Sequence, residues 1–359
     1  MKKNSLAVLH LQPMRIFSLL FAFFAYFSHP ILAQEKHLSN IRQLTFGGDN
    51  AEAYFSPNGK NLSFQSNNKN WGLECDQIFD LNIEKAAKDS NYKPIRISNG
   101  FGRTTCSYFM PNGKDILFAS THLGSHVCPT TEIIKGKYLW GVFDDFDIFI
   151  ANKKGKQKRQ LTDTKGYDAE ATVSPQGDKI VFTSTRSGDL ELWTMNIDGS
   201  NQTQITSQLG YDGGAFFSPD GKRIVYRASH PISDSEIIEY KTLLAKGLVA
   251  PTNMEIYTCN VDGSDVKKIT NLGKANWAPF FHPKGNKIIF SSNHHGERGY
   301  NFQLFMINID GTGLEQITTE SNFNAFPMFS PDGTQLVFSS NRNNHGTRDT
   351  NLFIADWHD

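Results

Sequence analysis

One short phrase recurs along this chain and limits what it can fold into. Residues 216–226 read FFSPDGKRIVY, and residues 328–338 read MFSPDGTQLVF. The same kind of turn occurs six times, and its prolines are Pro57, Pro111, Pro175, Pro219, Pro283 and Pro331. The steps between them are 54, 64, 44, 64 and 48 residues, and the shortest match the period of about 40–50 residues of propeller blades. The longer steps therefore indicate the same unit with inserted loops.

Each repeat predicts the same set of strands. Proline presets the first corner of the turn, Asn or Asp suits the second, and glycine tolerates the positive φ that follows. The turn therefore joins two strands into a hairpin. A third strand follows, as in LELWTMN from Leu190, and then a short fourth strand, as in TQIT from Thr203. Four antiparallel strands form one blade, and a ring of blades buries both faces of each.

The count of fourth strands indicates how the ring closes. The last repeat has three strands before the sequence ends, and a matching segment, RQLT at Arg42–Thr45, precedes the first turn. The N-terminal strand should therefore complete the last blade and hide its edge. We expect an all-β fold: a six-bladed β-propeller of four-stranded antiparallel blades closed by the N-terminal strand. An open β-solenoid or a stacked sandwich is the alternative.

The first residues predict export. Lys2, Lys3 and Arg15 precede or flank the apolar stretch 16–27, and the small residue Ala33 stands before Gln34. This pattern is typical of a signal peptide, so we predict a signal peptide at 1–33, the propeller at 34–359, and a periplasmic or secreted protein. The stretch is short for a membrane span of about 20 residues, although an uncleaved anchor is the alternative. No other segment predicts a membrane span.

Charge and motifs narrow the class of function. Lys and Arg number 36 and Asp and Glu 36, and removing the signal segment leaves 33 cations against 36 acids. We therefore expect no basic patch that favours nucleic acid. The sequence contains no GxSxG, no HExxH and no glycine-rich phosphate loop, which are the catalytic patterns that would identify common enzymes. No catalytic residue and no cofactor is expected.

The largest insertions follow the second strands of two blades. They span Thr121–Asp145 in blade 2 and Ser229–Asn253 in blade 4. Because strands alternate in direction, these loops and the loops that enter first strands should lie on one face. The second insertion contains SDSEIIEYKTLLAKG. Ser233 with Glu236 fits a capping box and Gly247 can end the helix, so we predict a short helical insertion in blade 4.

Polar residues recur where the first strands begin. First strands are innermost in a propeller, so these residues and their neighbours should ring the mouth of the central channel and bind a ligand. The predicted binding residues are Asn50, Glu52, Arg103, Asp168, Glu170, Asp212, Asn276, Trp277 and Asn324. Glu52 and Glu170 need a partner or water beside a buried strand, and Arg103 could be that partner. The structural alternative is that Asn and Asp cap loop backbones and that Trp277 belongs to the core.

The cysteines and histidines allow weaker expectations. Cys259 lies within a strand, and Cys75, Cys106 and Cys128 should lie towards one face; a possible disulfide joins Cys75 and Cys106. Loop histidines could supply a metal, but they come from four blades without tight spacing, so no metal site is expected. These histidines are His122, His126, His230, His294, His295 and His345.

The repeated turn, followed by a consensus close to xIYxMNxDGSxxxxIT, resembles the WD40-like repeats (PD repeats) of TolB-type six-bladed propellers. The resemblance covers about Ile41 to Trp357. It implies export to the periplasm and a channel mouth that receives a segment of the peptidoglycan-associated lipoprotein. TolB also has an N-terminal α/β domain, for which this sequence shows no counterpart. This difference from TolB leaves open whether the protein belongs to a Tol–Pal system.

Three functions follow as hypotheses. The first is a non-enzymatic, exported scaffold that binds a protein segment or an envelope-associated ligand at the channel mouth. The second is a carbohydrate-active enzyme that resembles oligogalacturonate lyases and uses loop histidines and carboxylates on the insertion face. The third is a purely structural module of the cell envelope. The sequence leaves the oligomeric state open.

Overall fold

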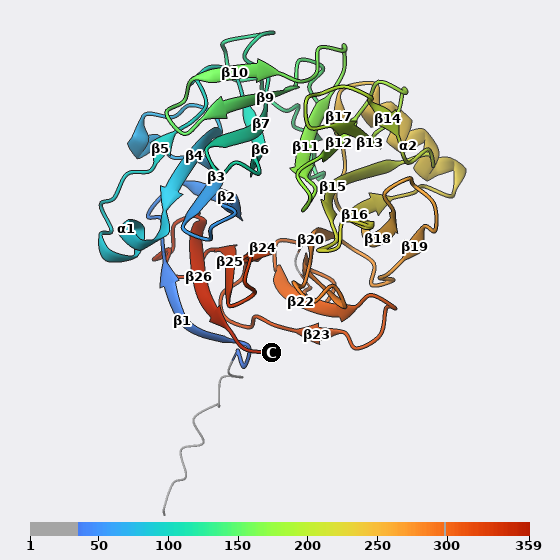
Figure 1. The fold of residues 1–359 in the computed structure, drawn as a ribbon. Coiled ribbons are helices and arrows are strands. Elements are labelled where there is room, and N and C mark those ends of the chain that lie inside the picture. The colour runs from blue at the N-terminus through green and yellow to red at the C-terminus, as the bar shows by residue number, and fades with distance from the viewer. Residues whose placement is uncertain (1–34, 298) are drawn as a thin grey trace, which may run out of the picture. The chain divides into compact units, whose positions relative to one another are not determined.

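The computed structural model describes residues 35–297 and 299–359, so the predicted signal peptide lies outside the described residues. Residues from Glu35 onward form one compact unit. Within the described residues, six four-stranded antiparallel sheets surround a common centre (Figure 1). The predicted six-bladed all-β propeller is therefore confirmed.

The blades follow one another along the chain, and each begins with its innermost strand. Blade 1 contains β2 (Asp49–Phe55), β3 (Asn61–Asn67), β4 (Gln77–Asn82) and β5 (Ile95–Arg96). Blade 2 contains β6 (Thr104–Phe109), β7 (Asp115–Ser120), β9 (Asp147–Asn152) and β10 (Gln157–Gln160). Blade 3 contains β11 (Asp168–Val173), β12 (Lys179–Ser184), β13 (Glu191–Asn196) and β14 (Thr203–Gln204).

Blade 4 contains β15 (Tyr211–Phe217), β16 (Arg223–Ser229), β18 (Glu255–Asn260) and β19 (Lys267–Lys268). Blade 5 contains β20 (Asn276–Phe281), β21 (Lys287–Ser292), β22 (Gln303–Asn308) and β23 (Glu315–Gln316). Blade 6 contains β24 (Asn324–Phe329), β25 (Gln335–Ser340), β26 (Asn351–Trp357) and β1 (Leu38–Gln43). Outside the blades lie β8 (Trp140–Gly141), β17 (Leu248–Val249), α1 (Ile83–Lys88), α2 (Asp234–Leu244) and a 3-10 turn at Lys69–Trp71.

The ring closes as predicted. Strand β1 pairs with β26, with Arg42 opposite Ile354 and Gln43 opposite Phe353. A buried ion pair supports this closure, because the Glu35 carboxylate accepts hydrogen bonds of 2.6 and 2.9 Å from the Arg342 guanidinium of blade 6. The outer strand of the last blade therefore comes from the start of the propeller, and it covers the edge of β26 that would otherwise be unpaired.

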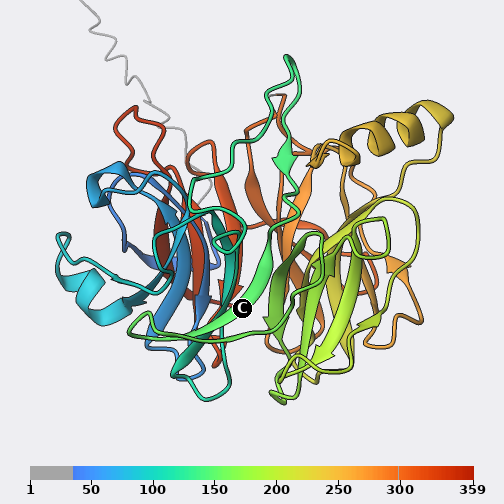
Figure 2. The same ribbon diagram turned by 90° about the horizontal axis from the view of Figure 1, so that it is seen from above.

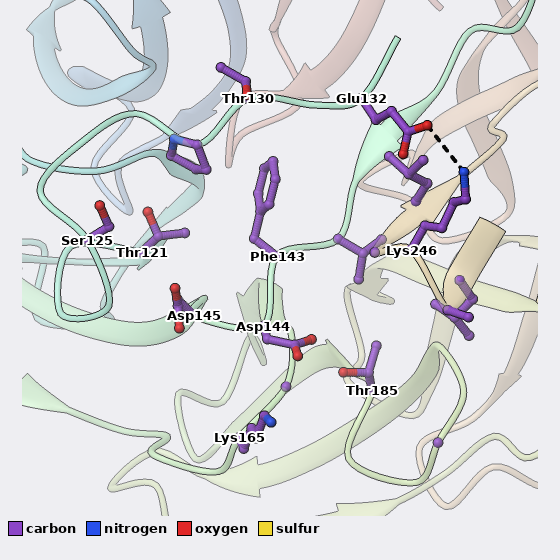
Figure 3. A pocket seen from close by; sticks show the side chains of 18 of the residues that line it. Thr121, Ser125, Thr130, Glu132, Phe143, Asp144, Asp145, Lys165, Thr185 and Lys246 are labelled. Carbon is purple, nitrogen blue, oxygen red and sulfur yellow. Dashed lines mark hydrogen bonds and ion pairs between the residues drawn. The ribbon is translucent and has the colours of Figure 1, made fainter. Parts of the chain in front are cut away.

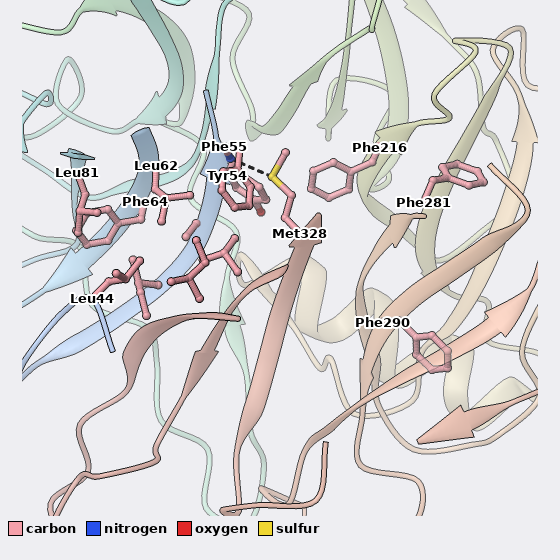
Figure 4. Packing of buried hydrophobic residues seen from close by; sticks show 14 of the residues in the cluster. Leu44, Tyr54, Phe55, Leu62, Phe64, Leu81, Phe216, Phe281, Phe290 and Met328 are labelled. Carbon is pink, nitrogen blue, oxygen red and sulfur yellow. Dashed lines mark hydrogen bonds between the residues drawn. The ribbon is translucent and has the colours of Figure 1, made fainter. Parts of the chain in front are cut away.

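The core lies between neighbouring blades. Phe64, Phe290 and Phe338 occupy the same position of three second strands, and each is fully buried. Figure 4 shows side chains of blades 1, 4, 5 and 6 packed together, with Met328 beside the Phe55 backbone. Fully burying such a side chain contributes about 1.5–3 kcal/mol. The apolar residues on both faces of the second and third strands thus hold the blades face to face.

Every first strand contains a β-bulge at the same position. The bulged residues have positive φ angles between 46° and 60°, and the ladder with the second strand shifts register there. Such a bulge re-aims one side chain. These residues are Glu52, Cys106, Glu170, Gly214, Ala278 and Phe326, and all of them line one small cavity in the channel.

The two ends of the channel differ. The blade 2 insertion and α2 project from one side, which we call the insertion face (Figure 2). The proline turns between first and second strands lie at the other ends of those strands, on what we call the turn face. In the part of the chain that the structure describes, no helix is long and apolar enough to cross a membrane.

Candidate functional site

The two insertions meet on the insertion face. Strands β8 and β17 pair as a small antiparallel sheet, with Leu248 opposite Gly141 and Val249 opposite Trp140. The Val142 amide donates a 2.7 Å hydrogen bond to the Gly247 carbonyl. Gly247 has φ 66°, and a Cβ there would lie 2.9 Å from the Val142 oxygen, so only glycine allows this approach. The loops of blades 2 and 4 therefore form one structure.

Helix α2 has the predicted start. The Ser233 hydroxyl accepts a hydrogen bond from the Glu236 amide, and the Glu236 carboxylate accepts one from the Ser233 amide. This capping box satisfies two amides that the first turn leaves free. The Tyr240 hydroxyl donates to the Gly210 carbonyl at 2.7 Å and contacts the Asp189 carboxylate. The helix is thus fixed over the loops that precede β13 and β15.

A groove of about 920 Å³ lies between the insertions and blade 3. Phe143 stands in its middle, with Asp144, Asp145 and Lys165 below it and Thr121 and Ser125 to one side (Figure 3). Ion pairs join the two insertions: Lys246 lies 3.2 Å from Glu132, and Lys137 pairs with Glu239. The groove therefore offers an aromatic ring between charges of both signs.

Large apolar side chains are exposed on the two insertions that form this groove. Ile133 is 92% exposed and Ile232 is 87% exposed. The other large, exposed apolar residues of the two insertions are Leu123, Val127, Tyr138 and Ile238. Exposed apolar residues gathered in one region mark interaction sites on soluble proteins. The groove, which we call the insertion groove, is therefore our candidate site, together with these exposed residues of the two insertions, which we call its rim.

The disulfide differs from the prediction. Cys75 is bonded to Cys128, with Cα atoms 5.6 Å apart, whereas Cys106 and Cys259 are free. The predicted Cys75–Cys106 pair is wrong because the bulge in β6 turns Cys106 into the channel. A disulfide requires the two Cα atoms to lie within about 7 Å with facing side chains. The bond formed instead ties the start of the blade 2 insertion to blade 1.

The polar residues at the starts of the first strands lie inside their blades. Asn276 donates to the Met254 carbonyl at 2.8 Å and accepts from the Ser292 hydroxyl at 2.6 Å. Equivalent hydrogen bonds hold Asn50 and Asn324, while Asp168 pairs with Arg186 and Asp212 with His230. All five side chains are at most 1% exposed. The structure thus gives them buried partners instead of a place on the surface of the mouth.

Glu52 and Glu170 come together in the channel, but Arg103 is not their partner. Arg103 lies 3.8 Å from Asp76. The Glu170 carboxylate pairs with Arg227 of β16. Glu170 also accepts hydrogen bonds from Tyr211, Gly214 and Thr183, at 2.7 to 2.8 Å.

The sequence carried a signal for this arginine. Arg227 follows the central aromatic residue of its second strand by one position, where the other blades have Gln65, Ala119, Thr183, Ser291 and Ser339. A cation among these neutral residues indicates a buried anion nearby. Sequence reasoning missed it because it considered only the first strands and the loops.

The channel also contains an acid beside a thiol. Burial raises the pKa of the Glu52 carboxyl, and the nearby Cys106 thiol and Arg227 act in the opposite direction. Burial and the adjacent Glu52 and Glu170 raise the pKa of Cys106 well above its usual value. Glu52 Oε2 has no hydrogen-bond partner among the described residues. The space here is only about 20 Å³, which is enough for one water molecule.

Aromatic residues cover the mouth of the channel at blades 4 and 5. Trp277 is buried and stacks on Phe302 at 4.2 Å, and its indole donates to the Pro251 carbonyl. Trp140 of β8 lies over it, with 5.2 Å between ring centroids, and the Arg227 guanidinium lies 5.0 Å from the Trp140 ring. A ligand on this face would therefore meet Trp140 before Trp277.

The turn face has a hollow that the sequence reasoning did not anticipate. A cavity of about 420 Å³ is lined by all six turn prolines together with aromatic residues such as Tyr108, Phe216 and Phe280. The signal was present in the sequence, because each turn proline follows an apolar or aromatic end of an innermost strand. Those ends converge at the axis, so the repeat itself produces an apolar hollow.

The loop histidines do not gather. His122 contacts Ser120 and His230 contacts Asp212, while His294 and His295 lie together in blade 5. Over residues 35–297 and 299–359, no three His, Cys, Asp or Glu side chains are grouped so that they could hold a metal ion.

Comparisons with solved structures give the same fold. The chain is 19% identical to a protein described as a TolB of Agrobacterium tumefaciens, with a TM-score of 0.57 and coverage of 89% of this chain and 97% of that one. It is 18% identical to TolB of Acinetobacter baumannii, with a TM-score of 0.51 and coverage of 86% and 63%. An oligogalacturonate lyase of Vibrio parahaemolyticus has 12% identity, a TM-score of 0.49 and coverage of 90% and 92%. No curated protein sequence matches the chain.

At these identities the likeness to solved structures concerns the fold alone. The sequence itself, however, matches the family described as TolB beta propeller domain over residues 142–246 and 249–348. These residues make up more than half of the 359 in the chain. The chain therefore belongs to the TolB β-propeller domain family.

Proposed function

We propose that this protein is an exported, non-enzymatic TolB-like propeller that binds a protein segment of the cell envelope in the insertion groove. The observation that carries the proposal is the joining of the two longest insertions around one groove with an apolar rim. Rigid scaffolds commonly present binding loops in this way. This moves the proposed contact from the channel mouth itself to the groove beside it.

The contacts of the insertions support a preformed site. The blade 2 insertion is tied to blade 1 by the Cys75–Cys128 bond and to blade 4 by β17. Helix α2 is held by Tyr240. Because the walls are fixed before a ligand arrives, little ordering entropy is lost when it binds. Export places such a disulfide in an oxidising compartment, which agrees with the predicted signal peptide.

Site-specific crosslinking tests this proposal. A photoreactive amino acid replaces Ile133, Tyr138 or Ile238 on the rim, and Val266, an exposed residue of a turn-face hairpin, serves as the control. In the native host, the rim positions should give the same discrete adduct and Val266 none. Phe143→Ala should weaken that adduct. Adducts from Val266 alone, or equal and nonspecific adducts from all positions, would count against the groove.

The lyase alternative is not favoured, because the likeness to solved lyases is too weak to carry an argument. Metal analysis of the purified protein would still separate the two functions. Stoichiometric manganese or zinc that disappears in the variant His294→Ala/His295→Ala would favour the enzyme. A metal-free protein that forms the rim adduct would favour the binding scaffold.

A further inference from the structure

The near-neutral overall charge hides a local excess of cations in blade 2. The hairpin that joins β9 to β10 reads NKKGKQKR from Asn152. The same hairpin reads NIDGSNQT from Asn196 in blade 3 and NVDGSDVK from Asn260 in blade 4. Lysines thus stand where other blades have an apolar residue, an aspartate and a serine.

The turn itself does not require Lys154 and Lys156. In blade 3 the Asp198 carboxylate accepts the Ser200 amide at 3.0 Å. In blade 2 the Asn152 side chain accepts the Lys154 and Lys156 amides at 2.9 and 3.0 Å, and Gly155 keeps a positive φ as Gly199 does. Both sequences therefore form the same turn. Adjacent lysines repel one another, so their presence points to a role outside folding.

The cations continue onto neighbouring segments. Gly155 lies against the Arg96 carbonyl of blade 1, and the Lys153 amide donates to the Lys114 carbonyl of the blade 2 turn. Lys153 and Lys158 pair with the buried Asp80 and Asp115. Five exposed cations of these segments have no ion pair within the described residues, and we call them the basic edge: Arg96, Lys114, Lys154, Lys156 and Arg159.

The shape of this region indicates the kind of partner. None of these cations lines the insertion groove, the channel cavity or the hollow of the turn face, so they lie outside the cavities that could enclose a single phosphate or carboxylate. Ile95, next to Arg96, is 52% exposed. Clustered cations with an exposed apolar side chain suit the interface of a bilayer that contains anionic lipids. Lys114, Lys154 and Lys156 lie in the turn-face loops of blade 2, and Arg96 lies in the outer strand β5 of blade 1.

We propose that the basic edge docks the propeller on an anionic phospholipid surface and leaves the insertion groove free for its partner. Each Lys or Arg near such a surface strengthens binding about fivefold. Neutralising Lys154 and Lys156 should therefore weaken vesicle binding about 30-fold. Salt should weaken it too, because the contacts are exposed.

Sedimentation with vesicles tests the proposal. The compact unit, prepared as residues 34–359, is mixed with phosphatidylglycerol–phosphatidylcholine vesicles or with phosphatidylcholine alone. We expect binding to the first only, and loss of binding in Lys154→Gln/Lys156→Gln. Lys222→Gln/Lys268→Gln removes equal charge from exposed positions of blade 4 and should retain binding.

A second variant guards against misfolding. Lys154→Asp/Lys156→Ser copies the residues of blade 3 and should melt like the wild type while losing vesicle binding. The proposal is overturned if wild-type protein ignores anionic vesicles, or if it binds phosphatidylcholine equally well. It is also overturned if Lys154→Gln/Lys156→Gln binds within about twofold of wild type, or if soluble polyglutamate is bound and vesicles are not.

Discussion

Replacing Arg227 by methionine tests the interior of the channel. Arg227 is 6% exposed and pairs with Glu170, which is 7% exposed. Removing one partner of a buried ion pair costs about 3–5 kcal/mol, because the other charge stays buried and uncompensated. The change tests whether this pair, absent from the sequence prediction, organises the channel.

The contacts that Glu170 keeps, and those that are lost with Arg227, decide where within that range the loss of unfolding free energy falls. Glu170 would keep Tyr211, Gly214 and Thr183 as neutral donors, and each hydrogen bond to a charged group contributes about 1.5–3 kcal/mol. The change would also remove the contact of the guanidinium with the Trp140 ring at 5.0 Å, which contributes about 2 kcal/mol at a desolvated site. We therefore expect Arg227→Met to lower the free energy of unfolding by about 3–4 kcal/mol.

Urea unfolding followed by tryptophan fluorescence measures this loss, with an unchanged slope expected if only stability changes. Arg227→Met/Glu170→Gln removes both charges and should recover about 2 kcal/mol of it, which a double-mutant cycle reports as coupling. Arg348→Met, at an exposed position, is the control and should shift stability by less than about 0.5 kcal/mol. A loss below about 1 kcal/mol for Arg227→Met, or no recovery in the double variant, would refute the reasoning.

Three further predictions follow from the same structure. Gly214→Ala places a Cβ 2.2 Å from the Arg227 guanidinium and should lower the free energy of unfolding, measured by chemical unfolding, by about 1–3 kcal/mol. This loss should be smaller in the Arg227→Met background, and an equal loss there would exclude the clash as its cause. Cys75→Ser/Cys128→Ser opens a loop with a sequence separation of 53 residues and should cost up to about 4 kcal/mol, seen as a lower melting temperature; unchanged melting would contradict the assigned bond. Burial, with Asp212 and Asp189 nearby, raises the pKa of the Glu191 carboxyl to about 8, so the folded state holds a proton that the unfolded state releases. The free energy of unfolding should therefore fall as pH rises from about 4.5 to 8, and Glu191→Gln should reduce this fall by about 1–2 kcal/mol after allowance for solvent screening. Melting curves of Glu191→Gln that keep the wild-type pH dependence would disprove the assignment.

The candidate site shows where prediction from sequence reached its limit. The insertions, their shared face and the helix after Ser233 were all predicted, because caps and breaks in the repeat are local features. Their pairing through β8 and β17 was not, since two residues on each side carry too little pattern. Glu170 was identified as needing a partner, but Arg227 lies 57 residues later, and only the packing of blades 3 and 4 brings them together.

The sequence by itself determined the number of blades, their strands and the closure by Arg42–Thr45. Turn chemistry and apolar patterning act over about ten residues and repeat, so each copy confirms the others. The tertiary structure decided which side chains face the channel. A bulge in every innermost strand turns one residue inward and leaves its predecessor two positions earlier buried within the blade. Cys106 and Glu52 therefore point to the axis, Asn50 and Asn276 do not, and Cys128 is left to bond with Cys75.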